Sequence, residues 1–79
     1  MYPTSSSVAE GYRRATRLFE RGDLERARRD FEKLLGRSGD PAIFFMLGRV
    51  HSELGQMDAA IARTLTAHQR SPTSDTLRN

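Results

Sequence analysis

The 79-residue sequence contains no cysteine, and this absence removes several kinds of site at once. Without thiols the chain has no disulfide framework, no thiolate metal site and no thiol nucleophile. A chain of this length forms one small domain or part of a longer protein, and a single core of this size supplies only about 3–5 kcal/mol. Its interior is too small to keep a reaction site away from water. The chain therefore folds by packing alone or together with a partner.

A long apolar run and a one-sided charge are also missing. No segment approaches the ~20 apolar residues of a membrane span, and the N-terminus lacks the charged-then-apolar order of a signal peptide. The net charge of +3 is spread along the chain: positions 1–40 carry 9 minus 7, or +2, and positions 41–79 carry 4 minus 3, or +1. A basic tail for nucleic acid is therefore not indicated. We expect a cytoplasmic protein that makes no membrane contact.

Apolar residues recur at helical spacing in four segments, so the predicted fold is all-α. Three signals mark helix starts: Ser7 with Glu10 forms a capping box, Asp23 precedes the second segment, and Asp40 precedes Pro41. The predicted helices cover residues 8–21, 24–35, 41–54 and 57–70.

An internal repeat organises these helices. Segments 20–27 and 53–60 share the skeleton Glu-x-Gly-x-(Leu/Met)-x-x-Ala, and the offset between them is 55 minus 22, or 33. A period of this length is typical of stacked helical hairpins. We expect one domain over residues 8–72, with repeat one at about 8–39 and repeat two at about 40–72. Residues 1–7 are expected to be flexible, residues 71–72 to stop the last helix, and residues 73–79 to form a flexible tail or the start of a further repeat.

The pattern resembles the tetratricopeptide repeat family. The second copy matches at Phe44, Leu47, Gly48, Gly55, Ala60, Ala67 and Pro72, and the first copy matches at Ala15, Gly22, Ala27 and Phe31. The first copy departs at Gly11 and Arg14, where the family prefers a large aromatic residue and Leu, and at Leu34, where it prefers Ala. The resemblance implies two antiparallel helix-turn-helix hairpins stacked as a short right-handed solenoid.

The same resemblance implies a concave surface that binds a peptide or helix, lined by the first helix of each hairpin. The matching positions here are Tyr12, Thr16, Phe19, Phe45, Arg49, Ser52 and Glu53. In this interpretation the three aromatic residues anchor an apolar ligand side chain, and Arg49 pairs with a carboxylate or stacks on a ring. In the alternative interpretation, Phe19 and Phe45 simply pack against the neighbouring repeat.

Catalytic and metal-binding constellations are not found in the sequence. His51 and His68 lie on different predicted helices, where we expect both to face the interior or the boundary of the second hairpin. Neither has an acidic residue at metal-ligand spacing. We therefore expect a protein without enzymatic activity, metal or cofactor.

A cluster of arginines lies on one side of the first predicted helix: Arg13, Arg14, Arg17 and Arg21, with only Glu10 and Glu20 as local partners. Such a cluster can touch nucleic acid or another anionic surface. A solvated helix face is the favoured interpretation, so nucleic acid is not an expected partner.

The last predicted hairpin poses a problem, because solenoid repeats bury their faces against neighbours and need polar caps at the ends. No amphipathic segment follows residue 72 to cover the edge made by Met57, Ile61, Leu65 and His68. The chain therefore self-associates through this edge, belongs to a longer repeat array, or receives a helix from a partner. The first two outcomes are favoured over a stable free monomer, and a self-assembling structural unit is the alternative to a peptide-binding module.

Overall fold

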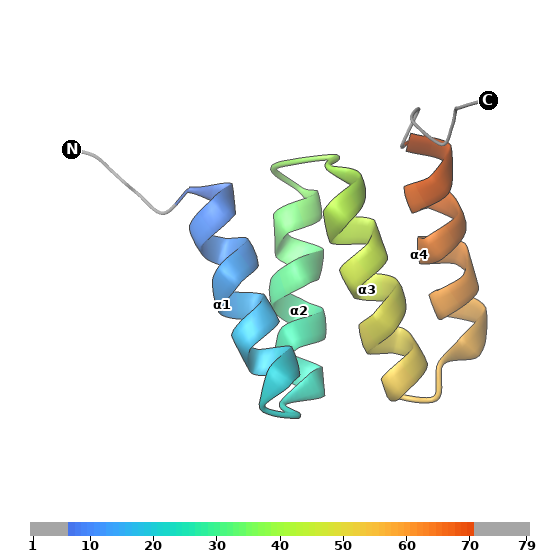
Figure 1. The fold of residues 1–79 in the computed structure, drawn as a ribbon, viewed down its shortest axis with the longest axis horizontal. Helices are drawn as coiled ribbons and strands as arrows, with labels where there is room; N and C mark the ends of the chain where they lie inside the picture. The colour runs from blue at the N-terminus through green and yellow to red at the C-terminus, as the bar shows by residue number, and fades with distance from the viewer. Residues whose placement is uncertain (1–6, 71–79) are drawn as a thin grey trace.

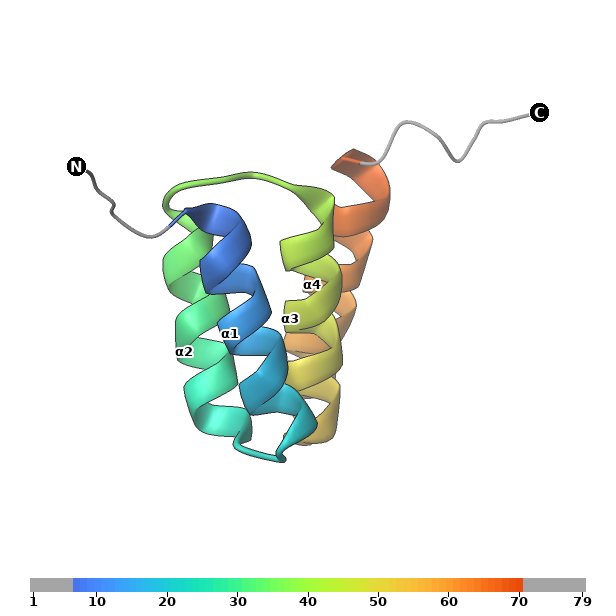
Figure 2. The same cartoon turned by 60° about the vertical axis from the view of Figure 1, so that its left-hand side comes forward.

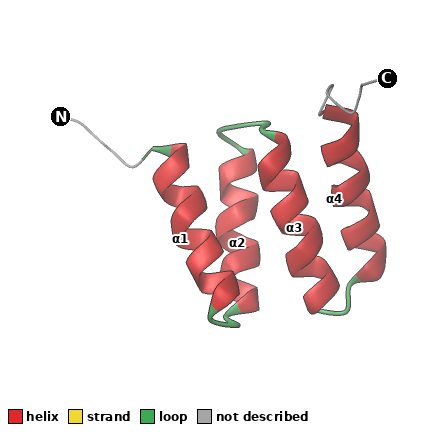
Figure 3. Cartoon of the chain, in the orientation of Figure 1, coloured by secondary structure: helices red, strands yellow, loops and turns green. Residues whose placement is uncertain are grey.

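The computed structural model describes residues 7–70, and all regular structure in this part of the chain is helical (Figures 1 and 3). The helices are α1 (Val8–Glu20), α2 (Leu24–Leu35), α3 (Pro41–Glu53) and α4 (Met57–Arg70). The predicted all-α fold is confirmed, with every helix within one residue of its predicted bounds. No helix between residues 7 and 70 is long and apolar enough to cross a membrane. The predictions for residues 1–6 and 71–79 lie outside the described residues.

Side chains at the helix starts satisfy amides that have no partner inside the helix. At α1 the Glu10 amide donates to the Ser7 hydroxyl oxygen at 3.0 Å, and the Ser7 amide donates to the Glu10 carboxylate at 3.3 Å, which confirms the capping box. At α3 the Ala42 amide donates to the Asp40 carboxylate at 2.9 Å. Asp23 is the N-cap residue of α2, as predicted, but it holds this place through its backbone alone, with its carbonyl accepting from the Ala27 amide at 3.0 Å. Its side chain makes no capping bond and instead faces Arg26, with 3.9 Å between Oδ2 and Nη1.

The two hairpin turns are built in the same way, one repeat period apart. Gly22 and Gly55 adopt left-handed conformations, with φ of 85° and 80°. In each turn the amide after the glycine donates to the carbonyl five residues earlier, at 2.9 Å in the first hairpin and 2.8 Å in the second. This bonding closes each helix end and reverses the chain. The repeat detected in the sequence is therefore a repeat of backbone geometry.

Helix α3 is the element that joins the two hairpins. It contacts α4 within its own hairpin and both α1 and α2 of the other (Figure 1). Figure 2 shows α1 in front of α2 and α3 in front of α4. The first helix of the second hairpin thus packs against both helices of the first hairpin, as expected for stacked hairpins. The right-handed sense of the stacking stays a prediction.

The main core lies between α3 and the first hairpin. Its buried members are Ala15 of α1, Ala27, Phe31 and Leu34 of α2, and Ile43, Met46, Leu47 and Val50 of α3. Helix α4 adds no residue to this cluster, and within its described length only Ala60 and Ala67 are buried. Each fully buried Phe, Leu, Ile or Val side chain contributes about 1.5–3 kcal/mol. Because Ala60 and Ala67 are the only buried residues of α4 and lie on one side of it, this helix is held by one face alone.

The departures from the repeat pattern at Gly11 and Leu34 compensate each other. A Cβ at position 11 would lie 2.8 Å from Leu34 Cδ2, so the Leu34 side chain fills the space beside Gly11. The equivalent pair in the second hairpin, one repeat period later, is Phe44 and Ala67. The large side chain comes from the second helix in one hairpin and from the first helix in the other. Leu34, Phe44 and Ala67 are all buried, and a shallow hollow of about 260 Å³ remains beside Gly11 and Leu34 in the first hairpin.

The two turn glycines and Gly36 offer a matched test of backbone strain. Gly55→Ala is expected to lower the free energy of unfolding by about 1 kcal/mol, because a left-handed conformation disfavours a residue with a Cβ. Gly36 lies at the C-cap of α2 with an ordinary φ of −70°, so Gly36→Ala should be neutral or slightly stabilising. Urea unfolding followed by circular dichroism measures both. Equal losses in the two variants would contradict the assigned role of Gly55.

The Gly11–Leu34 pair of the first hairpin can be replaced by the residue types of the equivalent pair in the second, Phe44 and Ala67. Leu34→Ala alone should destabilise the protein by about 2–5 kcal/mol, because it leaves a cavity beside Gly11. Adding Gly11→Phe reproduces the pair of the second hairpin and should recover at least about 1 kcal/mol of that loss. Thermal unfolding of both single variants and the double variant gives the coupling. A double variant no more stable than Leu34→Ala would show that the two hairpins are not equivalent here.

Candidate functional site

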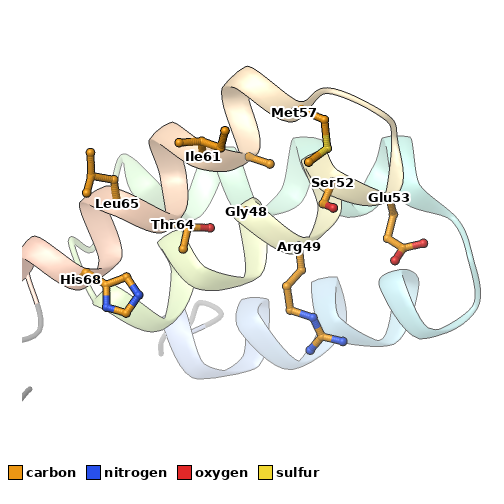
Figure 4. Close-up of a pocket in the computed structure, with 10 residues that line it drawn as sticks. Gly48, Arg49, Ser52, Glu53, Met57, Ile61, Thr64, Leu65 and His68 are labelled. Atoms are coloured by element: carbon orange, nitrogen blue, oxygen red, sulfur yellow. The ribbon is translucent and has the colours of Figure 1, made fainter.

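An open groove of about 590 Å³ runs between α3 and α4 (Figure 4). We call it the α3–α4 groove. Helix α3 contributes Gly48, Arg49, Ser52 and Glu53, and helix α4 contributes Met57, Ala60, Ile61, Thr64, Leu65 and His68. The groove lies on the side of the second hairpin that no described helix covers.

Small residues form the floor of the groove. Gly48 allows α3 and α4 to approach closely, because a Cβ there would lie 3.3 Å from the Ala60 carbonyl oxygen and would clash with the Thr64 hydroxyl. Ala60 is 5% exposed. With no large side chain on the floor, the depth of the groove is available to a ligand.

The α4 side of the groove is apolar and open to solvent. Met57, Ile61 and Leu65 are 54%, 61% and 55% exposed, and they are the most exposed large apolar side chains among residues 7–70. They follow one another at four-residue intervals on one face of α4, as Figure 4 shows. Burying such a row against an apolar partner is favourable by about 25 cal/mol per Å².

The α3 side of the groove is polar. Arg49, Ser52 and Glu53 are exposed there. The Arg49 guanidinium lies 5.0 Å from the centre of the Phe19 ring, a cation–π contact that links α3 to α1. A ligand in the groove would thus meet an apolar wall on one side and hydrogen-bonding groups on the other.

The structure divides the residues predicted for the concave surface into two groups. Arg49, Ser52 and Glu53 line the α3–α4 groove together with the four predicted edge residues. The remaining members of that surface lie outside the groove: Tyr12, Thr16, Phe19 and Phe45. The predicted concave surface and the predicted self-association edge therefore overlap in the α3–α4 groove. This groove is formed by the second hairpin alone.

The first-repeat members of the predicted surface are engaged in packing. The Tyr12 ring meets the Phe31 ring edge-on, with 5.7 Å between centroids. The pKa of Tyr12 is raised by burial and by the nearby Asp40 carboxylate, against an opposing effect of Arg49, so the phenol stays neutral at ordinary pH. The Thr16 hydroxyl is buried without a hydrogen-bond partner among residues 7–70. Phe19 packs against the core cluster and contacts Arg49 of the neighbouring repeat.

The two histidines have different surroundings. His51 is buried, and its Nδ1 lies 2.7 Å from the Gln56 side-chain oxygen. His68 is exposed at the end of the groove, so it lies at the boundary of the hairpin and not in its interior. Its ring meets that of Phe45, which is 40% exposed, edge-on at 5.3 Å. Residues 7–70 contain no group of three or more acidic or histidine side chains placed to hold a metal ion.

Three groove residues were not predicted as site residues: Gly48 and Ala60, which the sequence assigned to the fold, and Thr64, which it did not single out. The equivalent of Thr64 in the first hairpin is Phe31, since 64 minus 33 is 31. Phe31 is fully buried under α3, whereas Thr64 lies on an uncovered floor. The sequence did contain a signal for this difference, because the aromatic Phe31 of the first repeat is replaced by the small polar Thr64 in the second.

Comparison with known proteins adds no identification. A scan against protein-family models, a search of curated proteins and a search of solved structures each gave no match. The function must therefore be argued from the groove itself.

The exposed wall of α4 should contribute little to folding. Ile61→Gln and Leu65→Gln are expected to change the free energy of unfolding by less than about 0.5 kcal/mol, as surface substitutions do. Leu47→Ala, in the core, should cost about 2–5 kcal/mol. Urea unfolding of the three variants checks this contrast. A loss above about 1 kcal/mol for Leu65→Gln would show that the wall is already covered in the folded protein.

Proposed function

We propose that this chain is a non-catalytic protein-interaction module of the tetratricopeptide type, which binds a peptide or helix of another protein. The observation that supports this function is the α3–α4 groove. In it, three residues predicted for ligand binding, Arg49, Ser52 and Glu53, face an exposed apolar wall. Ligand grooves of this kind combine apolar contact area with a few polar groups that set orientation.

The cytoplasm is the proposed location, on the ground of composition and of a sequence without disulfide-forming residues. Neither enzymatic activity nor a cofactor is part of the proposal. Nucleic acid is not a proposed partner, because the arginines of α1 are flanked by Glu10 and Glu20 and the net charge is small.

Self-assembly is the second candidate function. Met57, Ile61 and Leu65 form a contiguous exposed row, and such a row can pair with its own copy across a two-fold axis. Membership in a longer repeat array would cover the same row. Substitution of Arg49 separates the candidates, because loss of a foreign ligand with self-association intact supports the binding module.

The proposed function is tested by affinity capture from an extract of the source cell. Bait carrying Leu65→Glu should lose the proteins that wild-type bait retains, because a charge in the apolar wall must be desolvated on binding. Gln69→Glu is the matched control: it adds the same charge to an exposed position of α4 outside the groove.

Identical capture by all three baits would contradict a groove-mediated interaction. Sedimentation equilibrium of the same proteins tests the second candidate. A wild-type dimer that Leu65→Glu converts to monomer, with nothing captured from the extract, would favour self-assembly over the binding module.

A further inference from the structure

We infer that the α3–α4 groove seats an amphipathic helix of another polypeptide, lying there as α3 lies on the first hairpin, with an aromatic side chain directed at Thr64. The inference rests on the proposed function and specifies its ligand. It starts from an equivalence inside the chain, since the second hairpin repeats the first one period later. The groove of the first hairpin is filled by α3, and the groove of the second is open.

Helix α3 supplies the template for such a ligand. Its residues in the core cluster are Ile43, Met46, Leu47 and Val50, all at most 8% exposed. They stand at positions i, i+3, i+4 and i+7, which is one face of a helix. A ligand helix on the equivalent groove should present apolar residues at the same spacing.

The floor of the open groove is hollower than that of the filled one. Position by position, Phe31 corresponds to Thr64, Ala15 to Gly48 and Phe19 to Ser52. Each change removes side-chain volume at a place that faces the docked helix. A ligand with aliphatic residues alone, such as α3 itself, would leave space over Thr64. An aromatic ring restores the volume that Phe31 supplies in the first hairpin.

The rims of the two grooves also differ, and the difference favours an apolar ligand. The first-hairpin equivalents of the α4 wall are Arg28 and Glu32, which form an ion pair at 3.0 Å, and Glu32 lies 3.9 Å from Arg63 of α4, so these positions face the second helix of the neighbouring hairpin. The equivalents of Arg28 and Glu32 in the second hairpin are Ile61 and Leu65. A ligand that meets this rim gains apolar contact where the internal interface has charge pairing.

A second copy docked head to tail does not fit the groove. Such a copy would present α1, the equivalent of α3, and its docking positions hold Glu10, Arg13, Arg14 and Arg17 in place of the four apolar residues of α3. All four are exposed, and together they line a polar hollow of about 240 Å³. Burying these charged side chains against the apolar wall without partners would be strongly unfavourable, because each charge loses its hydration.

The rest of this sequence does not supply the helix either. Residues 71–79 include one large apolar residue, Leu77, whereas the template requires four. Residues 1–79 thus contain no candidate for the docked helix, and the occupant proposed here is a helix with an apolar stripe from another polypeptide.

The test uses α3 as a synthetic probe. A fluorescein-labelled peptide of residues 40–54, with Phe44→Gln and Phe45→Gln for solubility, is compared with three versions that carry Phe at position 43, 47 or 50. Fluorescence anisotropy measures binding to the full 79-residue chain. At least one Phe version should bind the wild-type chain about tenfold more tightly than the parent peptide, because a buried ring adds contact area over Thr64.

The matched receptor is Thr64→Phe, which rebuilds the floor of the first hairpin. On it the advantage of the Phe peptides should fall to less than about twofold, while the parent peptide still binds. Circular dichroism reports whether Thr64→Phe folds. If it does not, Thr64→Leu fills part of the same space and carries the comparison. Gln69→Glu should bind all peptides as the wild type does.

The inference is overturned if no peptide binds the wild-type chain at about 1 mM, or if the advantage of the Phe peptides persists on Thr64→Phe. A dimer of the chain that the peptides do not displace would also overturn it, in favour of a second copy. Failure of the peptides together with extract capture that is sensitive to Leu65→Glu would refute the helix while leaving the binding module. Peptide binding without any protein captured from the extract would support the helix as an occupant of the groove and would contradict the binding module.

Discussion

The packing of α3 into the groove of the first hairpin is the contact on which the rest of the molecule depends. Three of the four largest fully buried side chains, Ile43, Leu47 and Val50, belong to this helix. Its other face holds α4 through the close approach at Gly48. Because α3 is covered on both faces, it fixes the position of α1 and α2 relative to α4. Helix α4 has support on one face only, and the open groove is the direct consequence.

The two ends of the stack are finished in different ways. On α1, the positions that would contact a preceding hairpin hold Glu10, Arg13, Arg14 and Arg17, and this charged face suits an end that meets water. The arginine cluster of the sequence therefore has a structural explanation that requires no anionic ligand. On α4, the corresponding end exposes Met57, Ile61 and Leu65. The two outer faces of the described stack therefore differ in kind, because the α1 face is charged and the α4 face is apolar.

The repeat skeleton predicted most of the fold, because helix caps, turn glycines and apolar spacing are local properties of the chain. Asp23 shows the limit of such signals: the residue type suits a cap, but its side chain faces Arg26. The site was less predictable. For Phe19 the sequence left an open surface and packing against the neighbouring repeat as alternatives, because the packing of Tyr12 and Phe19 against the core cluster depends on how the hairpins stack. Thr64 became informative only when its place under a missing helix could be compared with that of Phe31.

The mixed character of the open end argues against a surface that is merely unfinished. An end adapted to permanent exposure would replace the whole docking face with polar residues, as α1 does. An end buried permanently would keep an aromatic floor and a charged rim, as the first hairpin does with Phe31, Arg28 and Glu32. Here the floor is small and polar at Thr64, which limits the apolar area exposed when the groove is empty. The rim at Ile61 and Leu65 stays apolar and supplies the driving force when the groove is filled. That combination is consistent with the proposed docking of a helix, which requires a groove that tolerates water when it is empty and offers apolar contact when it is filled.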